Sequence, residues 1–262
     1  MISFTSTQLD AWLAAFVFPL ARILALLAIM PPFNNAALPQ RVRLVIGLAL
    51  TFVIAPALPP MPVIAAGSWL GLLILAQQIV IGVMLGFTMR LAFAAIDLAG
   101  DLIGLQMGLS FARFYDPQSS AQTAVLGDFL GILTILIFLA LNGHLLSISA
   151  LAESFRLLPI AATPLLVKGA GTLLSWAAII FSAGLLLSLP MLAALLIANL
   201  AMGVLARVAP QLNLFAIGFP VTMIAGFTVL LISLPYFGAA LERLFDQSFG
   251  ALRLIIQAAG TT

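Results

Sequence analysis

Gly104–Gly127 reads GLQMGLSFARFYDPQSSAQTAVLG, and the rest of the chain is organised around this stretch. On each side lies an apolar run that is long enough to enter or cross a membrane. The middle of the stretch turns abruptly polar, with Arg113, Asp116, Gln118, Ser119, Ser120 and Gln122. Irregular polar backbone is tolerated at membrane depth only where protein shields it or water reaches it. We therefore expect this loop to be shielded by protein, to line an aqueous cavity or to reach an aqueous face.

The composition is that of an integral membrane protein. Of the 262 residues, 64% are hydrophobic and only 7% are charged, and the mean hydropathy is +1.26. Soluble domains carry roughly 25% charged residues. The length suits roughly six helical segments of about 20 residues each, and the chain lacks the alternation of apolar and polar residues that strands of a membrane barrel require. The sequence therefore predicts an all-α membrane protein with little mass outside the apolar phase.

Several function classes are excluded by residues that the chain lacks. It has no cysteine, which excludes disulfides, thiolate metal sites and cysteine nucleophiles. It has a single histidine and neither a Gly-x-Ser-x-Gly nor a His-Glu-x-x-His pattern. The net charge of +2 rests on too few residues to indicate nucleic-acid binding. We therefore predict no catalytic residue, metal site, cofactor or nucleic-acid partner, and we do not expect an enzyme.

Apolar runs of helical length define the expected elements. They are Thr7–Met30, Gln40–Ala55, Ser68–Ser110, the end of the central loop to Leu158, Leu165–Val208, a helix ending at Leu234, and an amphipathic tail over Tyr236–Ala259. Ser6 or Thr7 is expected to cap the first helix, with Asp10 in its first turn. Prolines predict a kink at Pro190 and an interruption at Phe219-Pro220. Arg22 is costly in lipid, so it is expected to face protein.

Charged and small residues share one face of the third predicted helix. At about 100° per residue, the side chains of Arg90, Asp97 and Asp101 fall within a stripe about 40° wide. Gly104 and Gly108 lie on or beside the same stripe. Such residues are not expected to face lipid, because charge is costly there and small residues let another backbone approach. The stripe predicts contact with neighbouring subunits, and the alternative is pairing within the chain.

Glycines four residues apart recur along the apolar runs. The pairs and triplets are Gly67/Gly71, Gly82/Gly86, Gly100/Gly104/Gly108 and Gly127/Gly131. One such match is weak evidence, but four clusters predict dense packing of helices, either within the chain or with partners.

A polar turn over Arg207–Phe215 separates two apolar helices and predicts a helical hairpin. Its tip contains Arg207, Pro210, Gln211 and Asn213. Its polar groups could meet a partner or merely cap helix ends. The tail beyond it places Leu241, Leu244, Phe245, Phe249, Leu252 and Ile256 on one face, which suits a membrane surface or a partner groove.

One rival function remains open from the residues alone. An ion-coupled secondary transporter or a proton channel needs buried ionisable residues near the middle of the membrane. Asp97, Asp101 and His144 could serve that purpose, although they also suit contacts between subunits. The residues by themselves therefore define a polytopic membrane protein with polar stripes that face protein.

Several motifs resemble the FliR family of flagellar export-gate proteins, which are related to the SctT proteins of virulence type III secretion. The matching segments are Ala21-Arg22 with Pro31-Pro32, Pro39–Arg43, Gly100–Gly108, Asp116-Pro117, Asn142–His144, Ala206–Phe215 and Gly218–Pro220. The resemblance covers nearly the whole length. One departure is Thr222, where relatives commonly have a lysine.

The resemblance implies a fold, a location and a set of partners. It implies a FliP-like helical portion over residues 1–164 with a pore loop at 110–123, followed by a FliQ-like helical hairpin and tail over residues 165–262. Long, partly broken helices would form part of a helical spiral assembly with FliP and FliQ in the inner membrane. That assembly, part of the flagellar basal body and raised toward the periplasm, would pass unfolded flagellar proteins and contact FlhB and FlhA.

The same resemblance implies that the central loop reaches into the pore and helps to close it. Phe111, Phe114 and Tyr115 would supply bulk, and Arg113 and Asp116 would anchor the loop. Met107 would add a flexible apolar seal. The alternative is a surface loop whose aromatic side chains pack at the membrane interface. For the hairpin tip, the resemblance implies contact with FlhB.

Overall fold

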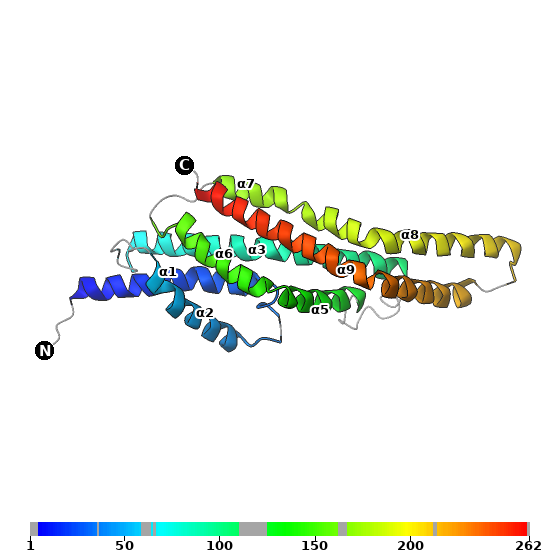
Figure 1. Ribbon diagram of the computed structural model, residues 1–262, viewed down its shortest axis with the longest axis horizontal. Coiled ribbons are helices and arrows are strands. Elements are labelled where there is room, and N and C mark those ends of the chain that lie inside the picture. Colours follow the sequence, from blue (N-terminus) through cyan, green and yellow to red (C-terminus); the bar gives the residue numbers. More distant parts are fainter. Residues whose placement is uncertain are drawn as a thin grey trace. The chain divides into compact units, whose positions relative to one another are not determined.

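The structure is a computed structural model, and it describes residues 5–35, 37–58, 64, 67–109, 125–161, 167–211 and 214–260. All regular structure in these ranges is helical, which confirms the predicted all-α class (Figure 1). The elements are α1 (Ser6–Ile29), α2 (Gln40–Ile54), the 3-10 helix η1 (Ala55–Ala57), α3 (Trp69–Gln106), α5 (Val125–Ala140), α6 (Gly143–Leu157), α7 (Val167–Trp176), α8 (Ile179–Val208) and α9 (Leu214–Gly260).

The helices are long and apolar enough for a membrane protein. Five segments of the described chain could each cross a membrane by length and composition: Gln8–Ile29, Gln40–Ala57, Trp69–Gln106, Lys168–Val208 and Ile217–Gly260. The number of possible spans rises to six if the bent pair of α5 and α6 counts as one span. This number agrees with the roughly six segments predicted from length.

The start of α1 differs slightly from the prediction. The cap is Thr5, because its side chain accepts a hydrogen bond from the backbone N–H of Gln8 while the Gln8 side chain accepts one from the N–H of Thr5. This reciprocal pair requires a Gln or Glu three residues after the cap. Of the three candidates, only Thr5 is followed by one, Gln8. The expectation of Ser6 or Thr7 as the cap is therefore wrong, and Asp10 lies beyond the first turn.

The predicted helix from the central loop to Leu158 is in fact two helices. α5 and α6 meet at an angle of 68°. At the junction, Asn142 adopts a left-handed conformation with φ 56° and ψ 25°. Asparagine tolerates this region better than other residues with a Cβ. The Asn142 carbonyl then accepts hydrogen bonds from Leu145 and Leu146 and starts the new helix.

The C-terminal half contains one break that was not predicted and lacks one that was, while the predicted kink at Pro190 stays a prediction. The segment before the hairpin is interrupted at Ala177 and Ala178, between α7 and α8, whereas Pro190 lies inside α8. Pro220 and Pro235 lie inside α9, which continues for 47 residues. The interruption at Phe219-Pro220 and the separate tail are therefore wrong. A proline removes only one backbone donor, and long apolar helices with packed neighbours tolerate that loss.

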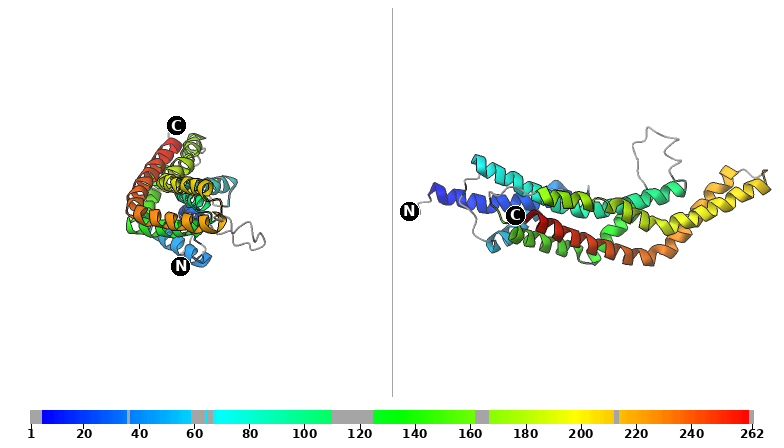
Figure 2. Two further views of the ribbon diagram at one scale, coloured as in Figure 1. Left: turned by 90° about the vertical axis from the view of Figure 1, so that its right-hand side faces the viewer. Right: turned by 90° about the horizontal axis from the view of Figure 1, so that it is seen from above.

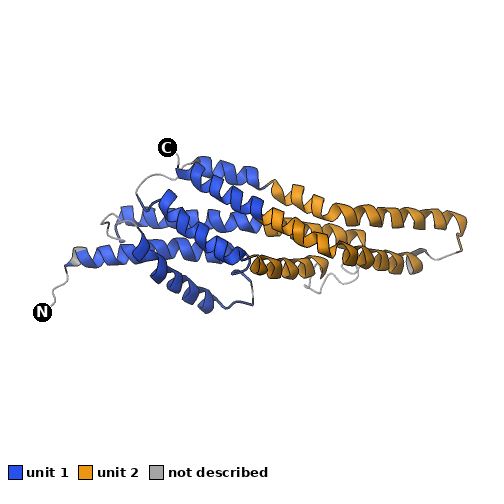
Figure 3. Ribbon diagram, viewed as in Figure 1, with its two compact units in different colours: residues 1–91, 142–177, 246–262 blue, residues 92–141, 178–245 orange. Residues whose placement is uncertain are grey.

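The described chain forms two compact units (Figure 3). Unit 1 comprises residues 1–91, 142–177 and 246–262, and unit 2 comprises residues 92–141 and 178–245. The predicted division between residues 164 and 165 concerns likeness to two other proteins rather than compactness, and it stays a prediction.

Close approach of backbones defines the packing of unit 1. α1 and the N-terminal part of α3 run side by side (Figures 1 and 2). A Cβ on Gly82 would collide with the carbonyl oxygen of Arg22, and one on Gly86 would lie 2.9 Å from the carbonyl oxygen of Leu26. α7 packs on the C-terminal end of α9, where a Cβ on Gly169 would lie 2.7 Å from that of Ala259. Glycine is required at these crossings because any side chain would separate the helices.

Unit 2 is packed in the same way around an aromatic cluster. A Cβ on Gly100 would lie 2.5 Å from the Cα of Gly127, so α3 and α5 cross backbone against backbone. The ring of Phe138 lies 5.7 Å from that of Phe93 and 5.0 Å from that of Phe245. Gly82, Gly86 and the Gly100–Gly127 pair thus confirm dense packing within the chain, whereas nothing lies within 4 Å of a Cβ on Gly67.

The apolar face of the C-terminal part of α9 is buried. Leu241, Leu244 and Phe245 in unit 2 and Leu252 and Ile256 in unit 1 are buried, and Phe249 is half-buried. The expectation that this face meets a membrane surface or a partner groove is wrong, because the chain covers it itself.

Candidate gating and assembly sites

The central loop is the first candidate site, and its stem is well defined. The aromatic and charged residues predicted to act in it, namely Phe111, Arg113, Phe114, Tyr115 and Asp116, lie outside the described residues. The described chain reaches Leu109 before the loop and resumes at Val125 after it. What the structure places is therefore the end of α3, from which the loop departs.

A glycine-dependent cap ends α3. Gly108 has φ 82°, a value that side chains disfavour. Its N–H donates to the carbonyl of Leu105 at 3.1 Å, and the N–H of Leu109 donates to the carbonyl of Gly104 at 3.0 Å. This pair of bonds is the Schellman arrangement, which satisfies two of the free carbonyls at the helix end. Gly108 thus shapes the departure of the loop.

Met107 is fully buried at this helix end. The Met107 side chain lies against Gly226 of α9. The Thr222 hydroxyl can donate a hydrogen bond to the carbonyl oxygen of Met107, at 3.3 Å. The sequence singled out Met107 but not Gly226, and Thr222 only as a departure from relatives. The signal that could have found them is their spacing of four residues, which puts both on one face of α9.

The residues of the charged stripe have two different environments. Gly104 is buried, with a Leu126 methyl group 4.0 Å from the position of its Cβ. Arg90 in unit 1 is exposed, and so are Asp97 and Asp101 in unit 2. A carboxylate oxygen of Asp97 lies 3.7 Å from the Cβ position of Gly131 on α5. The glycine thus packs within the chain, and the charged side chains remain on the surface of this chain.

The helical hairpin is present as predicted. α8 ends at Val208, where the N–H of Ala209 still donates to the carbonyl of Leu205, and α9 begins at Leu214. Arg207, Pro210 and Gln211 are exposed at the tip, and Asn213 lies outside the described residues. The described residues Arg207, Pro210 and Gln211 thus lie exposed between two long helices.

Arg22 lies at the most polar point inside unit 1, and no solvent reaches it. Its Nε donates to the side-chain oxygen of Gln78 in α3 at 2.9 Å. Nη1 donates to the carbonyl of Ser154 at 2.9 Å and to its hydroxyl at 3.2 Å, and Nη2 donates to the carbonyl of Leu158 at 2.8 Å. The prediction that Arg22 faces protein is confirmed.

This arrangement compensates a buried positive charge without any carboxylate among these partners. The guanidinium lies 4.1 Å from the centre of the Phe155 ring, a cation–π distance. The carbonyls of Ser154 and Leu158 belong to the last turn and the cap of α6, where the helix dipole is negative. The side-chain nitrogen Nε2 of Gln78 is buried without a partner. Arg22 therefore joins α1, α3 and the end of α6.

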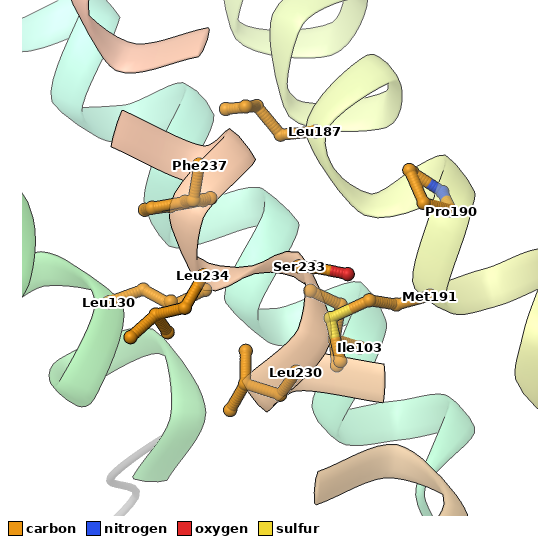
Figure 4. A pocket seen from close by; sticks show the side chains of 9 residues that line it. All are labelled: Ile103, Leu130, Leu187, Pro190, Met191, Leu230, Ser233, Leu234 and Phe237. Atoms are coloured by element: carbon orange, nitrogen blue, oxygen red, sulfur yellow. The ribbon is translucent and has the colours of Figure 1, made fainter. Parts of the chain in front are cut away.

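A small apolar cavity lies in unit 2 (Figure 4). Its volume is about 30 Å³, and nine residues from α3, α5, α8 and α9 line it: Ile103, Leu130, Leu187, Pro190, Met191, Leu230, Ser233, Leu234 and Phe237. Pockets that hold small-molecule substrates measure about 300–1,000 Å³. The cavity is therefore a packing void next to the Pro190 position. Among the described residues, His, Asp and Glu nowhere gather in a group of three that could hold a metal ion.

Fold and sites together define a polytopic, all-α membrane protein whose helices pack through glycines and carry exposed charges. The chain belongs to the bacterial export proteins, family 1, whose family model matches residues 13–248. The flagellar biosynthetic protein FliR of Pectobacterium carotovorum subsp. carotovorum is 46% identical over 259 residues, covering 98% of each chain. FliR of Escherichia coli K12 is 43% identical over 98% of each chain, and FliR of Bacillus subtilis 168 is 27% identical over 95% of this chain and 96% of its own.

These comparisons confirm the resemblance to the FliR family over nearly the full length. The chain is accordingly a membrane subunit of the flagellar protein export gate and takes part in flagellar biogenesis.

Proposed function

We propose that the chain forms part of the wall of an inner-membrane export channel, together with FliP and FliQ, and that its segment 110–123 closes this channel at rest. Unfolded flagellar proteins would pass through the channel toward the periplasmic side. The chain would act without catalysing a reaction, as a scaffold and a gate in the flagellar basal body.

The exposed charges on apolar helices carry this proposal. α3 is apolar enough to cross a membrane, yet Asp97 and Asp101 lie exposed on it, and Asp128 lies exposed at the start of α5. A carboxylate that faces lipid is strongly unfavourable, so such side chains face protein or water. Arg90, also exposed on α3, requires the same kind of cover. Partner subunits or an aqueous channel would cover the exposed parts of these side chains.

The hairpin of α8 and α9 supports an assembled state in the same way. In each of these two segments we consider an apolar stretch of 18 residues. This chain buries only 28% of that stretch in Lys168–Val208 and 17% of it in Ile217–Gly260. Large side chains such as Ile197, Leu200 and Leu231 are more than two-thirds exposed. Lipid alone could cover them, but two neighbouring helices with such broad free faces also suit packing against FliP and FliQ helices. Arg207, Pro210 and Gln211 at the tip would contact FlhB, with FlhA nearby.

The loop would act as a plug through bulk. Phe111, Phe114 and Tyr115 are large enough to obstruct a narrow channel, and apolar constrictions also block ions by excluding water. Arg113 and Asp116 would hold the loop in place by hydrogen bonds or a salt bridge.

Two measurements test this proposal. First, the chain is expected to co-purify with FliP and FliQ as one stable complex, and a functional isolated monomer would contradict it. Ion flux through vesicles that contain this chain alone would instead favour a transporter. Second, deleting Ser110–Tyr115 should leave the complex assembled but make cells leaky to small ions and dyes. A deletion variant that assembles and stays as tight as the parent would remove the case for a plug.

A further inference from the structure

The C-terminal end of α3 is seated in a notch on α9. At Gly226, a Cβ would lie within 2.6–2.7 Å of the Cγ, Sδ and Cε atoms of Met107. Real Cβ atoms do not approach other atoms this closely, so the Met107 side chain occupies the space that a larger residue at 226 would need. Met107 has no exposed surface. The Met107 side chain at the end of α3 thus fills the notch that Gly226 leaves in the surface of α9.

Thr222 can add a hydrogen bond to the same contact. Thr222 lies one helical turn before Gly226, and its hydroxyl lies 3.3 Å from the carbonyl oxygen of Met107 and 3.0 Å from that of Phe219. A hydroxyl has a single proton to donate. The Thr222 hydroxyl therefore donates either to the carbonyl of Met107, which links α9 to the end of α3, or to the carbonyl of Phe219 in its own helix, and the side chain is buried.

Met107, the residue held in the notch, directly precedes the point where the chain leaves α3. Met107 is followed immediately by Gly108, whose left-handed conformation turns the chain out of α3. With Met107 held on α9 and Gly108 bound in the helix cap, the position and direction of Leu109 follow. All these residues belong to unit 2.

We propose that Thr222 and Gly226 are positioning residues of the export gate: they clamp Met107 and thereby determine where the segment 110–123 begins. This inference rests on the proposed gating role of that segment. It assigns Met107 to an anchor inside the chain, in contrast to the seal expected from the sequence.

A size exchange tests the clamp in the assembled complex. Gly226→Leu should displace Met107 and raise the dye or ion leak of cells several-fold, with the complex still assembled. Adding Met107→Ala to Gly226→Leu should restore tightness, because the new side chain then fills the vacated space. Gly238→Leu, at a position of α9 where nothing lies within 4 Å of a Cβ, is the matched control and should stay tight. A tight Gly226→Leu variant, or a leak that Met107→Ala does not reverse, overturns the clamp.

The hydroxyl has its own test. Thr222→Val keeps the shape of the side chain and removes the donor, whereas Thr222→Ser keeps the donor. Loss of one neutral hydrogen bond shifts a two-state equilibrium by about five-fold. The Val variant should therefore leak more than the parent by up to this factor, and the Ser variant should not. Equal leakage of the two variants contradicts a role for the hydrogen bond.

Crosslinking separates the clamp from the plug. The chain has no cysteine of its own, so the pair Met107→Cys with Gly226→Cys reports one contact. In the assembled complex this pair should form a disulfide under mild oxidation, while Met107→Cys with Gly238→Cys should not. Absence of the first disulfide overturns the clamp whatever the loop does. A tight Ser110–Tyr115 deletion variant overturns the plug, and the crosslink still reports the clamp because it does not depend on leakage.

Discussion

The guanidinium of Arg22 lies 2.9 Å from the carbonyl oxygen of Ser154, although 132 positions separate the two residues in the chain. The bond ties α1 to the last turn of α6, and the Gln78 side chain ties the same guanidinium to α3. Three helices of unit 1 thus share one buried cation, and its hydrogen-bond partners within this cluster are neutral oxygens.

Arg22→Leu should destabilise the protein by about 3 kcal/mol or more, because each buried acceptor left without a donor costs about 1–3 kcal/mol. Arg22→Lys should also lose stability, since an ammonium group lacks the planar fork that reaches Gln78, Ser154 and Leu158 together. Thermal unfolding of the purified complex in detergent measures both effects. Arg253→Gln, at an exposed position of α9, is the control and should change little. Equal midpoints for Arg22→Leu and the parent would contradict the assigned role.

Gln78→Glu is expected to be neutral or stabilising by about 1 kcal/mol. The substitution keeps the oxygen that accepts from Arg22, replaces the buried nitrogen that has no partner, and places a negative charge beside the guanidinium. Gln78→Leu should instead cost about 2 kcal/mol, because it leaves the guanidinium without this acceptor. Thermal midpoints should rank Glu at or above Gln, and both above Leu. A Leu variant as stable as the parent would disprove the argument.

Gly100→Ala should destabilise unit 2 by about 1–3 kcal/mol, because the new methyl group would meet the backbone of Gly127 and force α3 and α5 apart. The matched control is Gly203→Ala in α8, where nothing lies within 4 Å of a Cβ. In open helical surroundings the same change stabilises by about 0.4–1 kcal/mol. Opposite signs of the two shifts in thermal midpoint are the expected result, and equal shifts would count against the close crossing.

Asn142→Val should cost about 1–2 kcal/mol, since a β-branched residue disfavours the left-handed conformation at the junction of α5 and α6. Asn142→Gly, which adopts this conformation freely, should retain the stability of the parent. Resistance to limited proteolysis and the thermal midpoint both report the difference. If Val and Gly behave alike, the bend does not depend on this backbone conformation.

Changing both Asp97 and Asp101 to Ala should weaken the assembly of the export gate. The two carboxylates lie exposed on an apolar helix, where contact with partner subunits would cover them. Co-purification with FliP and FliQ is expected to fall, while the amount of the chain in the membrane stays constant. Glu242→Ala, exposed on α9, serves as the control. Normal assembly and normal export by the double variant would show that the stripe serves another purpose.

Local chemistry explains what could be predicted. A chain with 7% charged residues can satisfy its backbone in an apolar phase only by internal hydrogen bonds, and its lack of alternation leaves helices as the solution. Gly82, Gly86 and Gly100 predict close helix crossings because only glycine allows such an approach. The location of Arg22 could be predicted because a charged side chain is costly in lipid whichever residues flank it in the sequence. The hairpin follows from a polar, proline-containing turn between two apolar runs.

Only the tertiary structure decided which residues contact one another and where the helices break. Gln78 and Ser154 reach Arg22 from 56 and 132 positions away, and no local pattern marks them for that contact. The bend at Asn142 and the unbroken course of α9 through Pro220 depend on which packing compensates a distorted backbone, so the residues alone predicted the wrong places. Gly226 is required only because Met107 lies against it. Such choices are made by contacts between distant segments, and these exist only once the helices have packed.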